Sequence, residues 1–206
     1  MKENSVSRLA HDSSSKEAFA GSGLSLHVSP RTESLPQGVS LRSLQTHHDE
    51  RGSLTELFRA SWETGIEIVQ WNYTESEARV LRGVHVHVKH ADYLILLRGR
   101  ATIGLRDLRI GSPTESMTAL VEMQGTRLHA LTIPPGVAHG FYFHEPSAHL
   151  YAVSEYWDKL DELGCRWADP ALEINWPDAE PLISGRDAAL PSLRELVESL
   201  PRAQQT

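Results

Sequence analysis

The sequence predicts an all-β domain, a sandwich or a barrel, with one short helix near its C-terminal end. From about residue 40 to 177, short β-like runs alternate with turn residues, and no helical periodicity persists over ten residues. Many short strands at hairpin spacing are typical of antiparallel sandwiches and barrels. We expect strands at 54–58, 66–73, 83–88, 93–97, 101–108, 118–123, 127–133, 140–143 and 149–154.

The chain ends flank this β-rich region and differ from it. Residues 1–35 are rich in Ser, charged and small residues, a composition that predicts a disordered tail. Near the other end, Leu193, Leu196, Val197 and Leu200 recur at helical spacing before Pro201, which predicts a short helix packed outside the β-structure. With 206 residues in all, the sequence therefore predicts a single domain over 36–206.

Composition and charge narrow the possible partners. A net charge of −7 gives no general attraction to a phosphate backbone, so we expect no nucleic-acid partner. No apolar run approaches the length of a membrane span, and the N-terminus lacks the apolar stretch of a signal peptide, so we expect no membrane partner. The single cysteine, Cys165, allows no intramolecular disulfide, which fits a cytoplasmic location.

A pair of histidines and a later glycine turn carry the clearest chemical pattern. His85 and His87 are two residues apart on a predicted strand, so their side chains share one face. Asp92 and Gly99 follow, and a Pro-Pro-Gly-Val-Ala-His segment at 134–139 ends at His139. This order resembles the paired motifs of cupin barrels, with Asp92 where metal-binding cupins usually carry Glu. The resemblance implies a double-stranded β-helix (cupin or jelly-roll) barrel.

A second resemblance is more specific and runs from about residue 49 to 187. The chain is similar to the dTDP-4-dehydrorhamnose 3,5-epimerase family in several segments that appear in the family's order. These are 49–52 (Asp-Glu-Arg-Gly), 70–72 (Gln-Trp-Asn), 81–85 (Leu-Arg-Gly-Val-His), 107–114, 133–141, 167–170 (Trp-Ala-Asp-Pro) and 174–177 (Ile-Asn-Trp-Pro). The resemblance implies a nucleotide-sugar epimerase that acts on a dTDP-4-keto-6-deoxy sugar, needs no cofactor and forms a homodimer.

The family resemblance also implies three catalytic roles. His85 would be the general base, Asp169 would hold its imidazole, and Tyr151 would be the acid on the opposite face of the sugar. A hydrogen next to a keto group is acidified because its removal gives an enolate, and an imidazole with a pKa near neutrality can accept that proton. A carboxylate on the far ring nitrogen fixes the tautomer and stabilises the imidazolium that forms.

Further residues are expected to bind the substrate. The diphosphate needs permanently charged, planar donors, for which Arg51 and Arg82 are the candidates. Tyr156 is the candidate for stacking on the base. The remaining members of the expected substrate-binding set are Glu56, Gln70, Asn72 and His139.

Two substitutions depart from the family pattern and leave alternatives open. The family has Lys at the position of Asp92 and usually Gln at that of His87, and a carboxylate beside a developing enolate is repulsive. His85, His87, Asp92 and His139 together suit a divalent metal, so one alternative is a metal-dependent cupin enzyme. Another is a homologue that binds sugar nucleotides without turnover. The histidines without motif context are expected to be surface or packing residues: His47, His48, His90, His129, His144 and His149.

Overall fold

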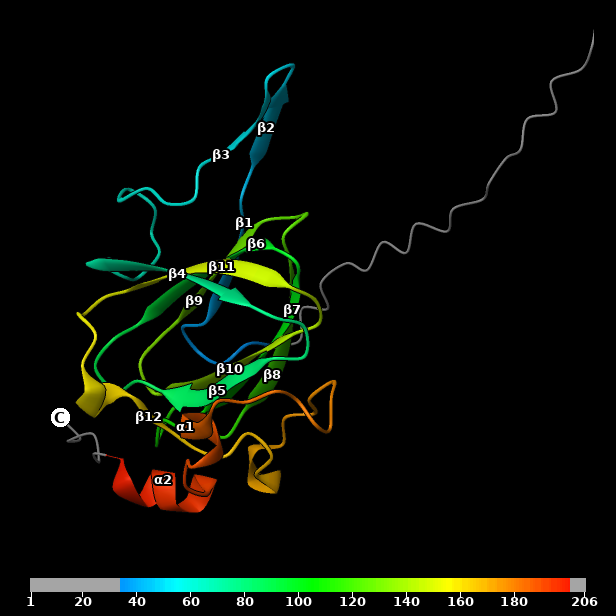
Figure 1. The fold of residues 1–206 in the computed structure, drawn as a ribbon. Helices are drawn as coiled ribbons and strands as arrows, with labels where there is room; N and C mark the ends of the chain where they lie inside the picture. Colours follow the sequence, from blue (N-terminus) through cyan, green and yellow to red (C-terminus); the bar gives the residue numbers. More distant parts are fainter. Residues whose placement is uncertain (1–33, 201–206) are drawn as a thin grey trace, which may run out of the picture.

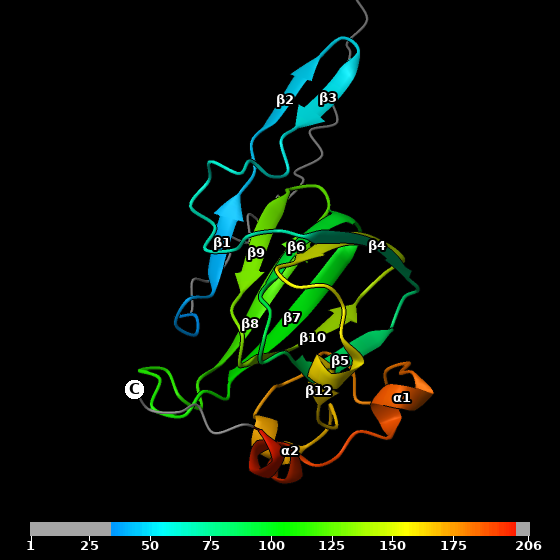
Figure 2. The same ribbon diagram turned by 90° about the vertical axis from the view of Figure 1, so that its left-hand side faces the viewer.

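The computed structural model describes residues 34–200, so the predicted N-terminal tail lies almost wholly outside the described residues. Most of the chain forms two five-stranded antiparallel sheets that face each other (Figure 1). A separate two-stranded hairpin projects from one end of this barrel, and the C-terminal segment packs below the second sheet (Figures 1 and 2). No helix in 34–200 is long and apolar enough to cross a membrane.

The first sheet has the strand order β1-β9-β6-β11-β4, and the second has the order β12-β5-β10-β7-β8. Strands that neighbour each other in a sheet are mostly distant along the chain, as the jelly-roll winding requires. The bounds are β1 Ser40–Ser43, β4 Gln70–Ser76, β5 Leu81–Val86, β6 Asp92–Arg98, β7 Arg100–Asp107, β8 Thr118–Gln124, β9 His129–Ile133, β10 Val137–Phe143, β11 Ser147–Val153 and β12 Leu163–Gly164. The hairpin consists of β2 Thr46–Asp49 and β3 Gly52–Thr55.

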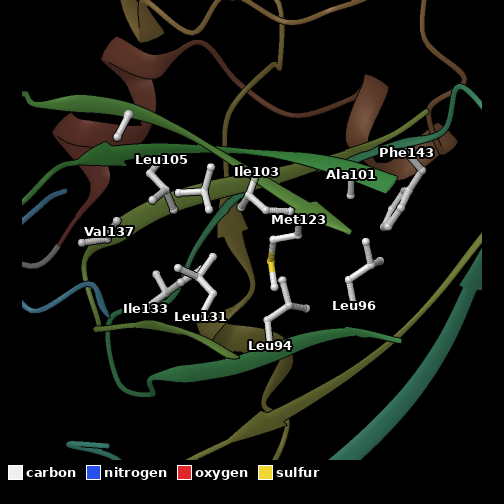
Figure 3. Close-up of a cluster of buried hydrophobic side chains, with 12 residues drawn as sticks. Leu94, Leu96, Ala101, Ile103, Leu105, Met123, Leu131, Ile133, Val137 and Phe143 are labelled. Carbon is white, nitrogen blue, oxygen red and sulfur yellow. The ribbon is translucent and has the colours of Figure 1, made fainter. Parts of the chain in front are cut away.

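The main core fills the space between the two sheets. Leu94 and Leu131 of the first sheet meet Ile103, Leu105 and Met123 of the second (Figure 3), and all five are at most 3% exposed. Side chains alternate between the two faces along each strand, and these five residues point to the inner faces of the two sheets. Burial between the two inner faces is the main stabilising contribution of the barrel.

A second core lies on the outer face of the second sheet. Val84, Val86 and Ala138 point outward there and pack against Leu172 and Leu193 of the C-terminal segment. That segment contains the short helices η1 Lys159–Asp161, η2 Pro170–Leu172, α1 Gly185–Ala188 and α2 Leu193–Ser199. The predicted helix at 192–200 is confirmed as α2, whose capping box joins Ser192 and Glu195.

Strands β5 and β10 approach each other closely at Gly83 and Gly140. A Cβ on Gly83, which has φ +119°, would lie 2.8 Å from the Cα of Gly140, so a side chain there would force the strands apart. In this register His85 of β5 lies opposite His139 of β10, and a bulge follows between His139 and Phe141. Two of the motif histidines are therefore cross-strand neighbours.

Candidate active site

A cavity of about 510 Å³ opens between the two sheets and receives side chains from both. The first sheet contributes Tyr151 and Asp92, and the second contributes His85 and His139. The C-terminal segment closes one side with Ser184, Arg186 and Asp187. The lining combines apolar and aromatic side chains with four histidines and several charged groups, which suits a polar small molecule.

His85 is paired with a carboxylate from the C-terminal segment. Its Nε2 lies 2.8 Å from Oδ1 of Asp187. The backbone N–H of Asp187 donates to Oγ of Ser184, the residue that caps the N-terminus of α1. Burial alone would raise the pKa of Asp187, but the hydrogen bond and charge of His85 outweigh it, so the pKa is lowered. An ionised Asp187 fixes the orientation of the imidazole and leaves the other ring nitrogen for substrate chemistry.

The predicted pairing of Asp169 with His85 is wrong. Oδ1 of Asp169 accepts a hydrogen bond of 3.0 Å from the backbone N–H of Ala171, and Oδ2 accepts one of 2.8 Å from that of Leu193. Asp followed by Pro170 is a favourable start for a helical turn, so Asp169 caps η2 and ties it to α2. Both of its carboxylate oxygens are already engaged in holding the backbone.

Tyr151 enters the cavity from the opposite wall. It lies on β11 in the first sheet, whereas His85 lies on β5 in the second, so the two side chains line the cavity from facing layers. Burial, with the nearby charges of Glu162 and Asp92, raises the pKa of Tyr151. The phenol is therefore protonated at neutral pH and can donate a proton.

Arg82 lines the cavity and is held from one side. Its Nε donates to Oγ of Ser76 at 2.9 Å, and its Nη2 donates to the backbone oxygen of Glu75 at 3.0 Å. Gln70 and Asn72 share the inner face of β4 and hydrogen-bond to each other at 2.9 Å, but neither lines the cavity.

Trp157, and not the predicted Tyr156, is the aromatic residue of this segment that lines the cavity. Tyr156 is 73% exposed and does not line the cavity, whereas Trp157 lines it and donates its backbone N–H to Gln70. The aromatic ring available for stacking on a base is therefore the indole of Trp157.

Two predicted substrate-binding residues, Arg51 and Glu56, lie away from the cavity of their own chain. Arg51 is at the turn of the projecting hairpin formed by β2 and β3. Its side chain is 82% exposed and paired with Asp49. Glu56 follows the hairpin and pairs with Arg59. Neither Arg51 nor Glu56 lines the cavity.

A buried cluster of histidines surrounds Asp92 at the inner end of the cavity. Nε2 of His139 lies 3.8 Å from the carboxylate of Asp92, and Nε2 of His87 and of His90 each lie 3.9 Å from it. Burial, with the charges of Glu162 and Asp161 opposing that of His87, raises the pKa of Asp92 to about 7.

This cluster differs from the predicted metal set by one residue. His85 is bound to Asp187, whereas His90, expected to be a surface or packing residue, is 4% exposed and lies within the cluster. The prediction of His85 as a ligand is therefore wrong for this arrangement, because its Nε2 has a carboxylate partner elsewhere.

Several site residues were not found from the sequence. Asp187, His90, Glu162 and Trp157 come from loops or short turns without a strand pattern to orient them. The one available signal was Ser184 three residues before Asp187, which is the spacing of a capped turn. His149 also lines the cavity, and its buried Nδ1 has no hydrogen-bond partner among the described residues.

The two facing sheets and the cavity between them define a cupin-type barrel enzyme with a histidine and carboxylate pair opposite a tyrosine. Residues 34–195 match the family model of dTDP-4-dehydrorhamnose 3,5-epimerase. The chain belongs to this family of nucleotide-sugar epimerases, which are isomerases.

Individual relatives agree with this assignment. The chain is 35% identical over 152 residues to a dTDP-4-dehydrorhamnose 3,5-epimerase of Pseudomonas aeruginosa, covering 68% of this chain and 82% of the relative. A solved epimerase of Mycobacterium tuberculosis has a TM-score of 0.76 at 29% identity, covering 86% of this chain and 95% of that one. A 3,5-epimerase of Legionella pneumophila, solved in complex with dTDP-4-keto-L-rhamnose, has a TM-score of 0.75 at 31% identity, with 82% and 95% covered.

Proposed function

We propose that this chain epimerises a dTDP-linked 4-keto-6-deoxy sugar at a carbon next to the keto group. The observation that carries the proposal is the placement of His85, with its carboxylate partner, and Tyr151 on opposite walls of one cavity. Inversion of a carbon needs a proton removed from one face and a proton delivered to the other. Two proton-transfer groups on facing sheets suit that requirement.

In the proposed reaction, the free ring nitrogen of His85 takes the proton from the carbon. The electron pair of the broken C–H bond moves toward the keto oxygen and gives an enolate. Asp187 stabilises the imidazolium that forms, and the phenol of Tyr151 returns a proton to the opposite face of the carbon. This proton transfer by itself requires no redox cofactor.

The proposed substrate is supported by what relatives bind. The Legionella pneumophila epimerase was solved with dTDP-4-keto-L-rhamnose, and a 3'-monoepimerase of Streptomyces bikiniensis was solved with dTDP as a double mutant of one histidine and one tyrosine. Histidine and tyrosine are also the residue types of the pair proposed here. Arg82 is our candidate diphosphate ligand and Trp157 our candidate for stacking on the base.

The proposal includes a homodimer in which the projecting hairpin reaches the partner's cavity. Arg51 cannot grip a diphosphate in its own cavity from the hairpin turn, but a second copy could present it to the neighbouring site. The edge strand β4 also exposes Trp71 and Tyr73, and an exposed apolar edge is suited to pairing between copies. Because a charged nucleotide sugar does not cross a bilayer unaided, we place this activity in the cytoplasm, where we expect such sugars to be made.

Solvent exchange with a dTDP-4-keto-6-deoxy sugar tests the assignment of the two groups. In heavy water the wild type should place deuterium on the carbon next to the keto group. His85→Asn should slow that exchange by roughly 10²-fold to 10⁴-fold while leaving dTDP affinity within about tenfold. Tyr151→Phe should retain the exchange that His85 initiates and lose inverted product. Exchange that survives His85→Asn unchanged would contradict the proposal.

A further inference from the structure

Three histidines and one carboxylate form a cluster whose facing atoms are all hydrogen-bond acceptors. Nδ1 of His87 lies 3.1 Å from the backbone oxygen of Asp161, and Nδ1 of His139 lies 3.1 Å from that of Val137. A carbonyl can only accept, so each Nδ1 carries the hydrogen and each Nε2 of the neutral ring is left with a lone pair.

The third histidine is fixed in the same way. Nδ1 of His90 lies 2.9 Å from Oδ2 of Asp161, a carboxylate that also accepts the backbone N–H groups of Val88 and Lys89. Asp161 therefore acts as a hydrogen-bond acceptor, and Nε2 of His90 is again the atom with a lone pair. The rings of His87 and His90 stack with centroids 4.0 Å apart, a contact that disfavours charge on both.

The three lone pairs converge on the carboxylate of Asp92. Its oxygens lie 3.8–3.9 Å from the three Nε2 atoms, which is too long for a hydrogen bond. Within residues 34–200, neither oxygen of Asp92 has a hydrogen-bond donor. The four side chains are each only 4–10% exposed, and three of them meet solvent through the cavity that they line.

We propose that His87, His90, Asp92 and His139 bind one divalent first-row transition-metal ion. His87, His90 and Asp92 each offer a ligand atom within 4.8 Å of the others, and Nε2 of His139 lies 3.8 Å from the same carboxylate. Ligands that surround such an ion at about 2.0–2.2 Å lie roughly 3.0–3.6 Å from each other, so the four side chains would close in on a bound ion. Imidazole nitrogens with one carboxylate suit ions of the zinc, iron or nickel type. The N–H at Nδ1 of each histidine already donates to an oxygen. Hydrogen bonds of this kind orient the imidazoles that bind metals.

The ion would face the substrate. His87, Asp92 and His139 line the same cavity as His85, whereas His90 lies behind them. A cation there could stabilise negative charge on a keto oxygen as the proton leaves for His85, a consequence that rests on the proposed function. The binding site itself does not depend on that function.

Metal binding is tested on the full chain without a histidine tag. Protein stripped with a chelator is loaded with Zn²⁺, freed of excess metal and analysed for bound zinc. We expect one zinc per chain, and a Co²⁺-loaded sample should show the visible bands of nitrogen and oxygen ligation. His90→Gln and Asp92→Asn should each weaken zinc binding by at least tenfold, and Asp161→Asn should weaken it by roughly 10-fold to 100-fold.

Two controls separate this site from other histidines. His85→Asn should keep zinc, because that side chain is bound to Asp187, and His48→Gln should keep it, because His48 lies in the projecting hairpin. A folded wild type that binds no zinc would overturn the proposal, as would loss of zinc in His48→Gln but not in His90→Gln. The cobalt spectrum of the wild type gives an answer even if a ligand variant fails to fold.

The catalytic consequence has a separate readout. Stripping zinc should slow deuterium exchange into the keto sugar at least tenfold, and adding zinc should restore it. Equal exchange in stripped and loaded protein would overturn the role of the ion in catalysis. Because zinc binding is measured without the sugar, failure of the proposed epimerisation would leave the binding result intact.

Discussion

At the scale of single residues, the buried carboxylate of Asp107 lies where several donors converge. Asp107 at the end of β7 is 1% exposed and accepts hydrogen bonds from the guanidinium of Arg109 and the hydroxyls of Ser112 and Thr114. Burial alone would raise the pKa of Asp107, but the hydrogen bonds from Arg109 and Thr114 outweigh it and lower the pKa to about 2. One side chain thus closes the turn between β7 and β8.

Asp107→Asn should therefore destabilise the barrel and remove part of its acid sensitivity. A folded-state pKa below the unfolded one contributes stability that is full above about pH 4 and is lost as the pH falls toward 2, by at most about 2 kcal/mol. Urea unfolding at pH 7 should show a loss of about 1–3 kcal/mol. Glu56→Gln, which removes an exposed ion pair, should change stability by less than about 0.5 kcal/mol. An Asn variant as stable as the wild type at pH 7 would contradict this role.

For the motif histidines, the sequence predicted which way the side chains face, because strands set their direction. His85, His87 and His139 lie on or beside strands, and they face one cavity as expected. The partner of His85 could not be predicted in this way, because Asp169 and Asp187 both lie in the irregular C-terminal segment. Which of them returns to β5 depends on how that segment packs against the outer core. His90 was missed for a similar reason, since it lies in the turn between β5 and β6.

At the scale of elements, short apolar or alternating runs bounded by turn residues predicted the strands around the inner core. The expected strands at 93–97, 101–108 and 118–123 correspond to β6, β7 and β8 within one residue at each end. The hairpin was the least well predicted, because β2 and β3 project from the barrel with mostly exposed side chains and so show no apolar alternation. Pairing order was also beyond the sequence, since neighbours such as β1 and β9 are far apart along the chain.

The projecting hairpin gives a prediction that depends on two copies. If Arg51 serves the partner's cavity, Arg51→Ala and His85→Asn are each defective alone, but a mixed dimer has one complete site. Co-expression with two different tags and purification of the mixed dimer should recover up to half of the wild-type exchange rate per dimer. If Arg51 acts within its own chain, or the protein is a monomer by light scattering, no recovery will occur.

At the scale of the whole molecule, different hydrophobic cores hold different parts of the chain. The core between the sheets holds the barrel, and the outer core anchors the C-terminal segment that carries Asp187 to the cavity. The active arrangement thus needs contacts between residues about 100 positions apart in the chain. The contact between His85 and Asp187 could not be predicted from the sequence, because it depends on how the C-terminal segment packs.

The most direct test of that contact compares two aspartates in the solvent exchange of a dTDP-4-keto-6-deoxy sugar. Asp187→Asn should reduce deuterium incorporation by about 10²-fold or more with dTDP binding retained, because the imidazolium of His85 loses its carboxylate. Asp169→Asn should keep incorporation near the wild-type rate and lower the melting temperature, because it removes a negatively charged cap. The reverse result, with exchange lost in Asp169→Asn and kept in Asp187→Asn, would contradict the account.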